Sequence, residues 1–263
     1  MSDFHGSPCW FELTTGKGDL AAAEGFYADV LGWQMQDAGV EGFDYRLARS
    51  DGDMVAGLME MPSDKSGMPP NWLIYFAVED ADKAATDIRA AGGSIHREPA
   101  DIPRTGRFAI VADPQGAVFG ILQPLPMDDG SEAGRAFDQS KAGHGNWTEL
   151  MSTDPEAGFD FYAALMGWQK ADAVDMGDMG TYQLFSHKGA DIGGMMGLGN
   201  ASMPVWLPYF GANGVTEAMA RIKSGGGNII HGPQEVPGGA FIAIATDPQG
   251  AHFAVVGPKE TTQ

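Results

Sequence analysis

Each half of this sequence carries a tryptophan and a glutamate two residues apart, in a stretch whose apolar pattern predicts a strand. The pairs are Trp10 with Glu12 and Trp147 with Glu149. Because side chains alternate across a strand, each pair points to one face of its sheet and sets an indole beside a carboxylate. Partial desolvation suits such a glutamate to abstract a proton next to a carbonyl. We take Glu12 and Glu149 as candidate acid/base residues; alternatively, each carboxylate accepts hydrogen bonds within the fold and each indole fills the core.

Other aromatic side chains fall on predicted strands at equivalent places in the two halves. They provide either the apolar wall of a ligand site or plain core. Together with Trp10 and Trp147, the candidates for binding a substrate are Tyr45, Trp72, Tyr75, Tyr182, Trp206 and Tyr209.

Two arginines distinguish the halves from each other. Arg104 and Arg107 lie in a predicted loop, where the second half has Gly238 and Phe241. Guanidinium groups bind carboxylates and phosphates through paired hydrogen bonds, so this loop is a candidate site for an anionic part of the substrate. The alternative is a solvated loop.

The charge balance and the single cysteine exclude several classes of protein. Thirty-five acidic against sixteen basic side chains give a formal net charge of -19, which repels nucleic acid and anionic lipid surfaces. Cys9 cannot form an intrachain disulfide, and the first residues lack the pattern of a signal peptide, so we expect a cytoplasmic protein without a membrane partner. Cys9 itself is expected to be a small buried residue.

A repeat of about 135 residues organises the chain. The run Asp113 to Ala117 recurs as Asp247 to Ala251, at an offset of 134. The halves agree over nearly their whole length, which predicts two domains: a first over residues 1–126 and a second over 144–263, joined by a polar linker at 127–143.

Within each copy the hydrophobic period alternates between strand and helix. In the first copy we expect a strand near Trp10 to Thr15, a helix from Asp19 to Gly32, and three further strands before residue 60. A second round follows, with a helix ending at Gly92 and an Asp-Pro-Gln-Gly turn before the last strand. Each copy therefore reads β-α-β-β-β twice, an α+β fold.

This order of elements resembles the vicinal oxygen chelate superfamily of glyoxalases, bleomycin-resistance proteins and dioxygenases. The phrases that carry the resemblance are Phe26-Tyr27 with Leu31-Gly32-Trp33, their counterparts from Phe161 to Trp168, the paired glycines at 92–93 and 226–227, and the Asp-Pro-Gln-Gly turn. The likeness is greatest to the two-domain glyoxalase-like proteins assigned as hydroxylases. It implies curled mixed sheets, two modules per domain, and two halves that pack as a pseudo-dimer within one chain, with further self-association into a homodimer left open.

Metal-dependent members of this superfamily hold a divalent ion with His, Gln or Glu on the first and last strands of each module. The matching positions in this sequence carry no such ligands: they are Trp10, Gly57, Leu73 or Trp72, Gly120, Trp147, Gly194, Leu207 or Trp206, and Ala254. We therefore expect no metal and no cofactor. The alternative is a shifted site that uses His252 with Glu149 or Glu12.

Three interpretations of function follow from these residues. The first is a metal-free protein that binds a small apolar or aromatic molecule. The second is an enzyme that acts on a small carbonyl or aromatic metabolite: a lyase or isomerase with Glu12 or Glu149 as proton carrier, or a glyoxalase-like or dioxygenase-type metal enzyme. The third is an inert partner protein whose duplicated sheets serve assembly.

Overall fold

The computed structural model of the chain describes residues 4–62, 67–125 and 135–261. Over these residues it has two eight-stranded mixed sheets, one from each copy, in the orders β2-β3-β4-β1-β5-β8-β7-β6 and β10-β11-β12-β9-β13-β16-β15-β14. The predicted α+β fold of paired βαβββ modules is therefore confirmed. The boundaries predicted for the copies stay a prediction, because residues 126–134 lie outside the described part.

The elements of the two copies correspond one to one. The first copy consists of β1 Pro8–Thr15, α1 Leu20–Leu31, β2 Gln34–Asp37, β3 Tyr45–Ser50, β4 Asp53–Glu60, β5 Asn71–Ala77, α2 Ala81–Ala90, β6 Ser94–Ile102, β7 Gly106–Ala112 and β8 Val118–Pro124. The second consists of β9 Gly145–Ser152, α3 Pro155–Met166, β10 Gln169–Asp175, the 3-10 helix η2 Gly177–Met179, β11 Thr181–His187, β12 Ala190–Gly197, β13 Val205–Gly211, α4 Val215–Ser224, β14 Asn228–Glu235, β15 Phe241–Thr246 and β16 His252–Gly257.

The first helix of each copy ends as the sequence predicts, on a glycine in the left-handed region. Gly32 and Gly167 have φ angles of 72° and 75°, a conformation that favours glycine over residues with a side chain. Helix starts differ between the copies. Asp154 caps α3 by accepting a hydrogen bond from the Ala157 backbone N–H, whereas the Asp19 side chain makes no capping bond at α1.

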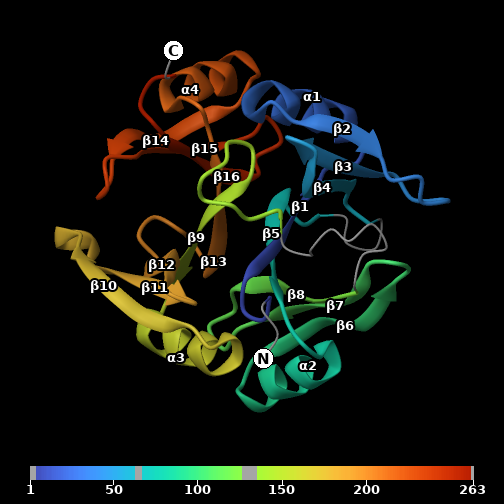
Figure 1. Cartoon of the computed structure of the whole chain (residues 1–263), viewed down its shortest axis with the longest axis vertical. Helices are drawn as coiled ribbons and strands as arrows, with labels where there is room; N and C mark the ends of the chain where they lie inside the picture. Colours follow the sequence, from blue (N-terminus) through green and yellow to red (C-terminus); the bar gives the residue numbers. More distant parts are fainter. Residues whose placement is uncertain (1–3, 63–66, 126–134, 262–263) are drawn as a thin grey trace. The chain divides into compact units, whose positions relative to one another are not determined.

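The chain divides into two compact units, and each unit combines segments of both copies. We call them the α1/α4 unit, formed by residues 10–73, 135–147 and 208–263, and the α2/α3 unit, formed by residues 1–9, 74–134 and 148–207. Helices from different copies meet inside each unit: α1 contacts α4, and α2 contacts α3 (Figure 1).

A buried chain of hydrogen bonds runs through the core of each unit. In the α1/α4 unit, the Trp72 indole N–H donates to the Tyr27 hydroxyl (2.8 Å), which donates to Asp247 (3.0 Å). In the α2/α3 unit, the Trp206 indole N–H donates to the Tyr162 hydroxyl (2.9 Å), which donates to Asp113 (3.0 Å). We call these the core relays.

Each core relay ends on the aspartate of an Asp-Pro-Gln-Gly turn. Asp113 uses its other carboxylate oxygen, Oδ1, to accept from the backbone N–H groups of Gln115, Gly116 and Ala117. The predicted turn forms, because Gly116 N–H also donates to Asp113 O at 3.0 Å. Burial raises the pKa of both Asp113 and Asp247 above the usual range.

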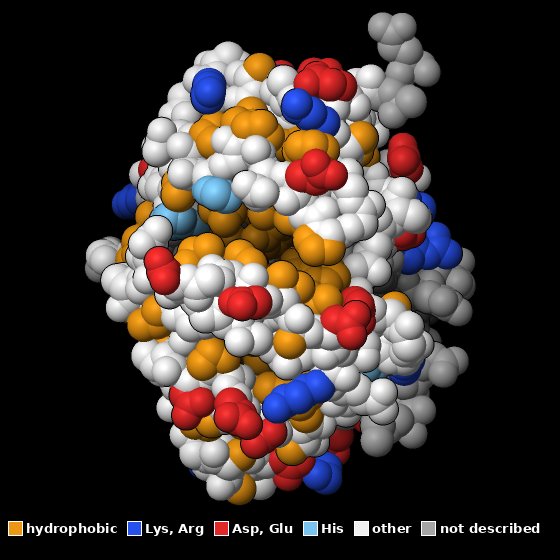
Figure 2. Space-filling model, turned by 90° about the vertical axis from the view of Figure 1, so that its left-hand side faces the viewer, with side chains coloured by type: hydrophobic (Ala, Val, Ile, Leu, Met, Phe, Trp, Pro, Cys, Tyr) orange, Lys and Arg blue, Asp and Glu red, His pale blue; other side chains and the backbone are white. Residues whose placement is uncertain are grey.

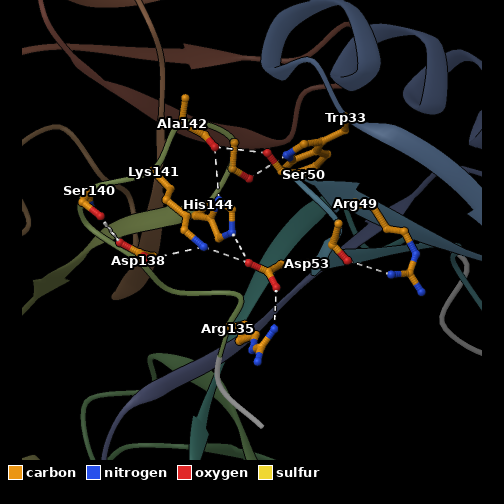
Figure 3. A network of polar contacts seen from close by, with 12 residues as sticks. Trp33, Arg49, Ser50, Asp53, Arg135, Asp138, Ser140, Lys141, Ala142 and His144 are labelled. Carbon is orange, nitrogen blue, oxygen red and sulfur yellow. Dashed lines mark hydrogen bonds and ion pairs between the residues drawn. The ribbon is translucent and has the colours of Figure 1, made fainter. Parts of the chain in front are cut away.

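The described end of the predicted linker is held to the β3–β4 turn by a polar network, which Figure 3 shows. Asp53 accepts from Arg135 (3.2 Å) and Lys141 (2.9 Å) and lies 3.4 Å from the His144 ring Nε2. These contacts lower the pKa of Asp53, that from Lys141 most. Residues 127–134 of the linker lie outside the described residues.

Acidic side chains are scattered over the face drawn in Figure 2, among neutral and apolar ones, with fewer basic groups between them. This agrees with the strongly negative net charge of the sequence. No helix in the described part of the chain combines the length and apolar character needed to cross a membrane.

Candidate functional site

Glu12 lies at the end of a hydrogen-bonded chain on one face of the first sheet. The Trp10 indole N–H donates to the Tyr45 hydroxyl (3.1 Å), and that hydroxyl donates to Glu12 Oε2 (2.9 Å). All three side chains are partly exposed. Phe11 and Leu13, which alternate with Trp10 and Glu12 along β1, are fully buried. The alternation predicted for Trp10 and Glu12 is thus present, and we call these three residues the face triad.

The Tyr45 phenol is held as a hydrogen-bond donor. Burial, together with the charge of Glu12, raises its pKa well above the usual range. The hydroxyl therefore stays protonated at neutral pH and fixes the position of the carboxylate. A carboxylate held in this way beside an indole can accept a proton or a hydrogen bond from a bound molecule.

Gly57 makes room for the Tyr45 ring. It pairs with Glu12 in the parallel ladder between β4 and β1. A Cβ atom at Gly57 would overlap the Tyr45 phenol, so the tyrosine covers this glycine closely. Glycine in a strand interior often marks such a close approach.

The second copy repeats this arrangement. Gly194 on β12 pairs with Glu149 on β9, and a Cβ at Gly194 would overlap the Tyr182 ring. Glu149 is buried, with 7% of its surface exposed, whereas Glu12 is partly exposed. The copies thus share the tyrosine-covered glycine but differ in the exposure of the carboxylate.

The second module of each copy has a related pairing of tyrosine with a small residue. Gly120 on β8 pairs with Tyr75 on β5, and a Cβ at Gly120 would overlap the Tyr75 ring. In the other copy Tyr209 pairs with Ala254, which is fully buried. Sequence analysis identified the tyrosines and the small residues separately but missed that they are partners.

These pairings do not fit a divalent ion of the kind that the superfamily resemblance implies. Of the four ligand positions on the last strands of the modules, three are glycines whose Cβ space is filled by a tyrosine ring, and the fourth is the buried Ala254. Among the described residues, no group of three or more His, Cys, Asp and Glu side chains gathers to hold a metal. His252 is exposed at the start of β16.

Trp72 and Trp206 belong to the core relays and not to the face triad. Each is nearly buried and donates its indole N–H within a core relay. Trp72 and Tyr75 are three residues apart on β5, so alternation places their side chains on opposite faces. Contact of either tryptophan with a ligand stays a prediction.

The two arginines of the predicted anion-binding loop have different surroundings. Arg107 lies on strand β7, so its placement in a loop was wrong, and it forms ion pairs with Asp82 (2.7 Å) and Asp101 (2.9 Å). Arg104 is exposed in a left-handed turn conformation, with φ of 62°. Binding of a ligand by either arginine stays a prediction. The guanidinium of Arg107 is already paired with two carboxylates.

Cys9 is a buried thiol, as the sequence predicts. It is 6% exposed and its Sγ donates to the Tyr75 backbone oxygen at 3.4 Å. Burial raises the thiol pKa well above the usual range, so Cys9 is no nucleophile at neutral pH.

Loop 139–146 borders an open groove in the α1/α4 unit. The groove has a volume of about 410 Å³ and is lined by residues of that loop, of 211–213 and of 256–258, with Thr261. None of the candidate residues from the sequence lines it.

The fold agrees with comparisons to known proteins. The Glyoxalase/Bleomycin resistance protein/Dioxygenase superfamily matches the chain twice, over residues 13–121 and 145–255. The chain belongs to this superfamily, and the resemblance stated from the sequence is confirmed.

Two curated relatives align along almost the whole chain. One is named "Putative glyoxylase CFP32", from Mycobacterium tuberculosis; it is 30% identical over 260 residues, covering 96% of this chain and 95% of the relative. The other, anthracycline biosynthesis protein DnrV of Streptomyces peucetius, is 32% identical over 273 residues, covering 97% and 94%.

Solved structures share the fold at low sequence identity. A Mn(II)-bound glyoxalase from Novosphingobium aromaticivorans has a TM-score of 0.65 at 17% identity, with 97% of this chain and 83% of that chain covered. Homoprotocatechuate 2,3-dioxygenase from Brevibacterium fuscum, in complex with 3,4-dihydroxyphenylacetate, has a TM-score of 0.68 at 17% identity, with 95% and 80% covered.

Proposed function

We propose that this protein binds a small apolar or aromatic molecule without a divalent metal, against the sheet faces that carry Glu12 and Glu149. The observation that supports this best is the tyrosine ring over glycine at the ligand positions of the superfamily: Tyr45 over Gly57, Tyr75 over Gly120 and Tyr182 over Gly194. An aromatic ring in that place offers an apolar surface and a hydroxyl, where a metal site would need imidazoles or carboxylates.

The face triad supplies a directional polar group to the same site. Glu12 is fixed by the Tyr45 hydroxyl, and the indole of Trp10 lies on the same strand face. Ligand sites commonly combine an apolar wall with a small number of placed polar groups. The ligand class we infer is a flat ring with a hydrogen-bond donor directed at Glu12, and the anthracycline name of one relative agrees with an aromatic ligand.

A screen of metabolites by thermal shift tests this proposal, because a molecule that binds only the folded state raises its apparent stability. We expect aromatic hits whose affinity, measured by calorimetry, falls in Trp10→Leu and in Tyr45→Phe. The matched control is Phe137→Leu, a half-buried aromatic residue outside the triad. Hits of purely aliphatic character, or equal binding in all variants, would contradict it.

A second candidate function is proton transfer by Glu12 or Glu149 on a small carbonyl or aromatic metabolite. The observation that favours it is the fixed carboxylate at the end of the face triad. Glu12→Gln and Glu149→Gln keep the shape of the side chain and remove its basicity. Retained binding with lost turnover of a bound hit would support catalysis, whereas unchanged product formation in both variants would contradict it.

A further inference from the structure

Phe43 is a large apolar side chain that the fold leaves exposed beside the face triad. It lies in the turn between β2 and β3 (Figure 1), and 43% of its surface is exposed. Its ring stacks on the Tyr45 ring, with 6.0 Å between the centroids and 24° between the planes. Phe43, Tyr45, Trp10 and Glu12 all belong to the α1/α4 unit. An aromatic surface that solvent reaches therefore extends the face triad.

The backbone of the turn holds Phe43 in this place. Its N–H donates to the Val40 carbonyl oxygen at 3.2 Å, within the turn. The Ala38 N–H donates to the Tyr45 carbonyl oxygen at 2.9 Å and closes the hairpin around it. The position of the ring is thus set by the local backbone as well as by its contact with the tyrosine.

Half-buried apolar side chains continue this surface along the sheet. Leu47 pairs with Gly57, and Gly57 pairs with Glu12, so the three residues share one face. Both Leu47 and Met59, which lies two residues beyond Gly57, are half-buried, whereas Leu58 points to the other face and is fully buried. Apolar and aromatic side chains around a single placed polar group are the usual lining of a small-molecule site.

The charges on and around this surface favour a cation. The Tyr45 hydroxyl uses one of about four acceptor sites of the Glu12 carboxylate. Both arginines of β3 are engaged with other groups: Arg46 forms ion pairs with acidic side chains, and Arg49 donates hydrogen bonds to a glutamine side chain and a backbone carbonyl. The net charge of -19 adds a general attraction for cations.

The second copy differs from the first at this surface. No aromatic residue stands between Trp168 and Tyr182, the stretch that corresponds to the one containing Phe43. Glu149 is buried with 7% of its surface exposed, whereas Glu12 is partly exposed. The first copy therefore combines an exposed ring with an accessible carboxylate, and the second does not.

We propose that this face of the first copy binds one aromatic amine, with the ligand ring against Phe43 and Tyr45 and its ammonium group directed at Glu12. Aromatic ring faces attract cations, and a carboxylate accepts strong hydrogen bonds from a charged N–H donor. Phe43 determines specificity, because its ring is the part of the wall that the second copy lacks. The inference rests on the proposed function and names the ligand class and the copy that binds it.

A matched pair of probes tests this inference by calorimetry. 2-(Aminomethyl)naphthalene carries a protonated amine at neutral pH, and 2-naphthalenemethanol is its neutral analogue. We expect the wild-type protein to bind about one amine per chain, at least about tenfold more tightly than the alcohol. Glu12→Gln should weaken amine binding by at least about tenfold and alcohol binding by less than about twofold. Phe43→Leu should weaken binding of both probes by at least about fivefold.

Two variants control for general effects of charge and of aromatic content. Glu41→Gln removes a charge from the exposed turn that contains Phe43, and Phe137→Leu removes a half-buried ring outside the face triad. Both should leave the two affinities within about twofold of the wild-type values. Circular dichroism and thermal unfolding check that Phe43→Leu, a change at an exposed position, keeps the fold.

The outcomes separate this inference from the proposed function. Equal affinity for the two probes, or equal losses in Glu12→Gln and Glu41→Gln, overturns the assignment to a cation and leaves the proposed function standing. Two equivalent sites per chain, or full binding by Phe43→Leu, overturns the assignment to the first copy. Failure to bind either probe overturns the inference, and it contradicts the proposed function as well only when the thermal-shift screen also finds no aromatic hit.

Discussion

The α1/α4 unit contains two hydrogen-bonded chains of the same chemical composition, each running from tryptophan through tyrosine to a carboxylate. In the core relay, Trp72, Tyr27 and Asp247 are 5%, 0% and 3% exposed. In the face triad, Trp10, Tyr45 and Glu12 are all partly exposed. The order of donors and acceptors is identical, so burial and the surroundings of the carboxylate distinguish the two.

The carboxylates differ most in what holds them. Asp247 closes a tight turn through the backbone N–H groups of Gln249 and Ala251, and the relay recurs at Asp113. Glu12 lies in mid-strand beside Gly57, and its phenol partner lies over that glycine. The comparison indicates that the first chain stabilises the fold, whereas the second arranges a surface for a ligand.

The largest expected effect comes from Tyr27→Phe. It leaves the buried Trp72 N–H without its acceptor and Asp247 without its donor, so we expect the free energy of unfolding to fall by about 3 kcal/mol. Tyr45→Phe removes the equivalent hydroxyl from the face triad and should cost less than about 1 kcal/mol, because water can replace it. Urea denaturation at neutral pH measures both; equal losses would mean that the two chains play the same role.

Gly57→Ala tests the close cover by Tyr45. The new methyl group displaces the phenol, so we expect a loss of about 1–2 kcal/mol in stability and weaker binding of aromatic ligands. Gly197→Ala is the matched control on β12, because its Cβ meets no other atom within 4 Å. Near-wild-type stability and binding in Gly57→Ala would contradict the packing described.

The smallest effect concerns pH and the core-relay carboxylates. Because burial raises the pKa of Asp113 and Asp247, the folded protein binds their protons more tightly than the unfolded chain does. Their titration therefore stabilises the fold below about pH 4 and this contribution is lost as the pH rises through the raised pKa. The stability lost in Asp113→Asn should consequently be larger at pH 4 than at pH 6.5.

Asp53 provides a comparison in the same measurement, because its pKa is shifted in the opposite direction. Its pKa is lowered, chiefly by Lys141, so its contribution is present above about pH 4 and disappears as the pH falls through the lowered pKa. The loss in free energy of unfolding caused by Asp53→Asn should therefore be smaller at acidic pH than at neutral pH. The same trend in both variants would contradict one of the two assignments.

The sequence predicts the fold well because its signals are local. Period-two strands, helices ending at Gly32 and Gly167, and the Asp-Pro-Gln-Gly turn each depend on a few neighbouring residues, and the repeat confirms each signal a second time. The alternation of Trp10 and Glu12 follows from the same rule. What alternation could also have indicated is that Trp72 and Tyr75, three residues apart, face opposite sides.

The contacts between residues far apart in the sequence were beyond such rules. Tyr27 and Asp247 are 220 residues apart, and nothing in their neighbours indicates the hydrogen bond between them. The cover of Gly57 by Tyr45 depends on the register of β3 against β4.

The most direct test of metal-independent binding combines elemental analysis with calorimetry on protein purified without chelator. We predict far less than one equivalent of manganese, iron, nickel or zinc per chain, and unchanged affinity for an aromatic ligand after treatment with EDTA. A near-stoichiometric metal whose removal abolishes binding would contradict the account.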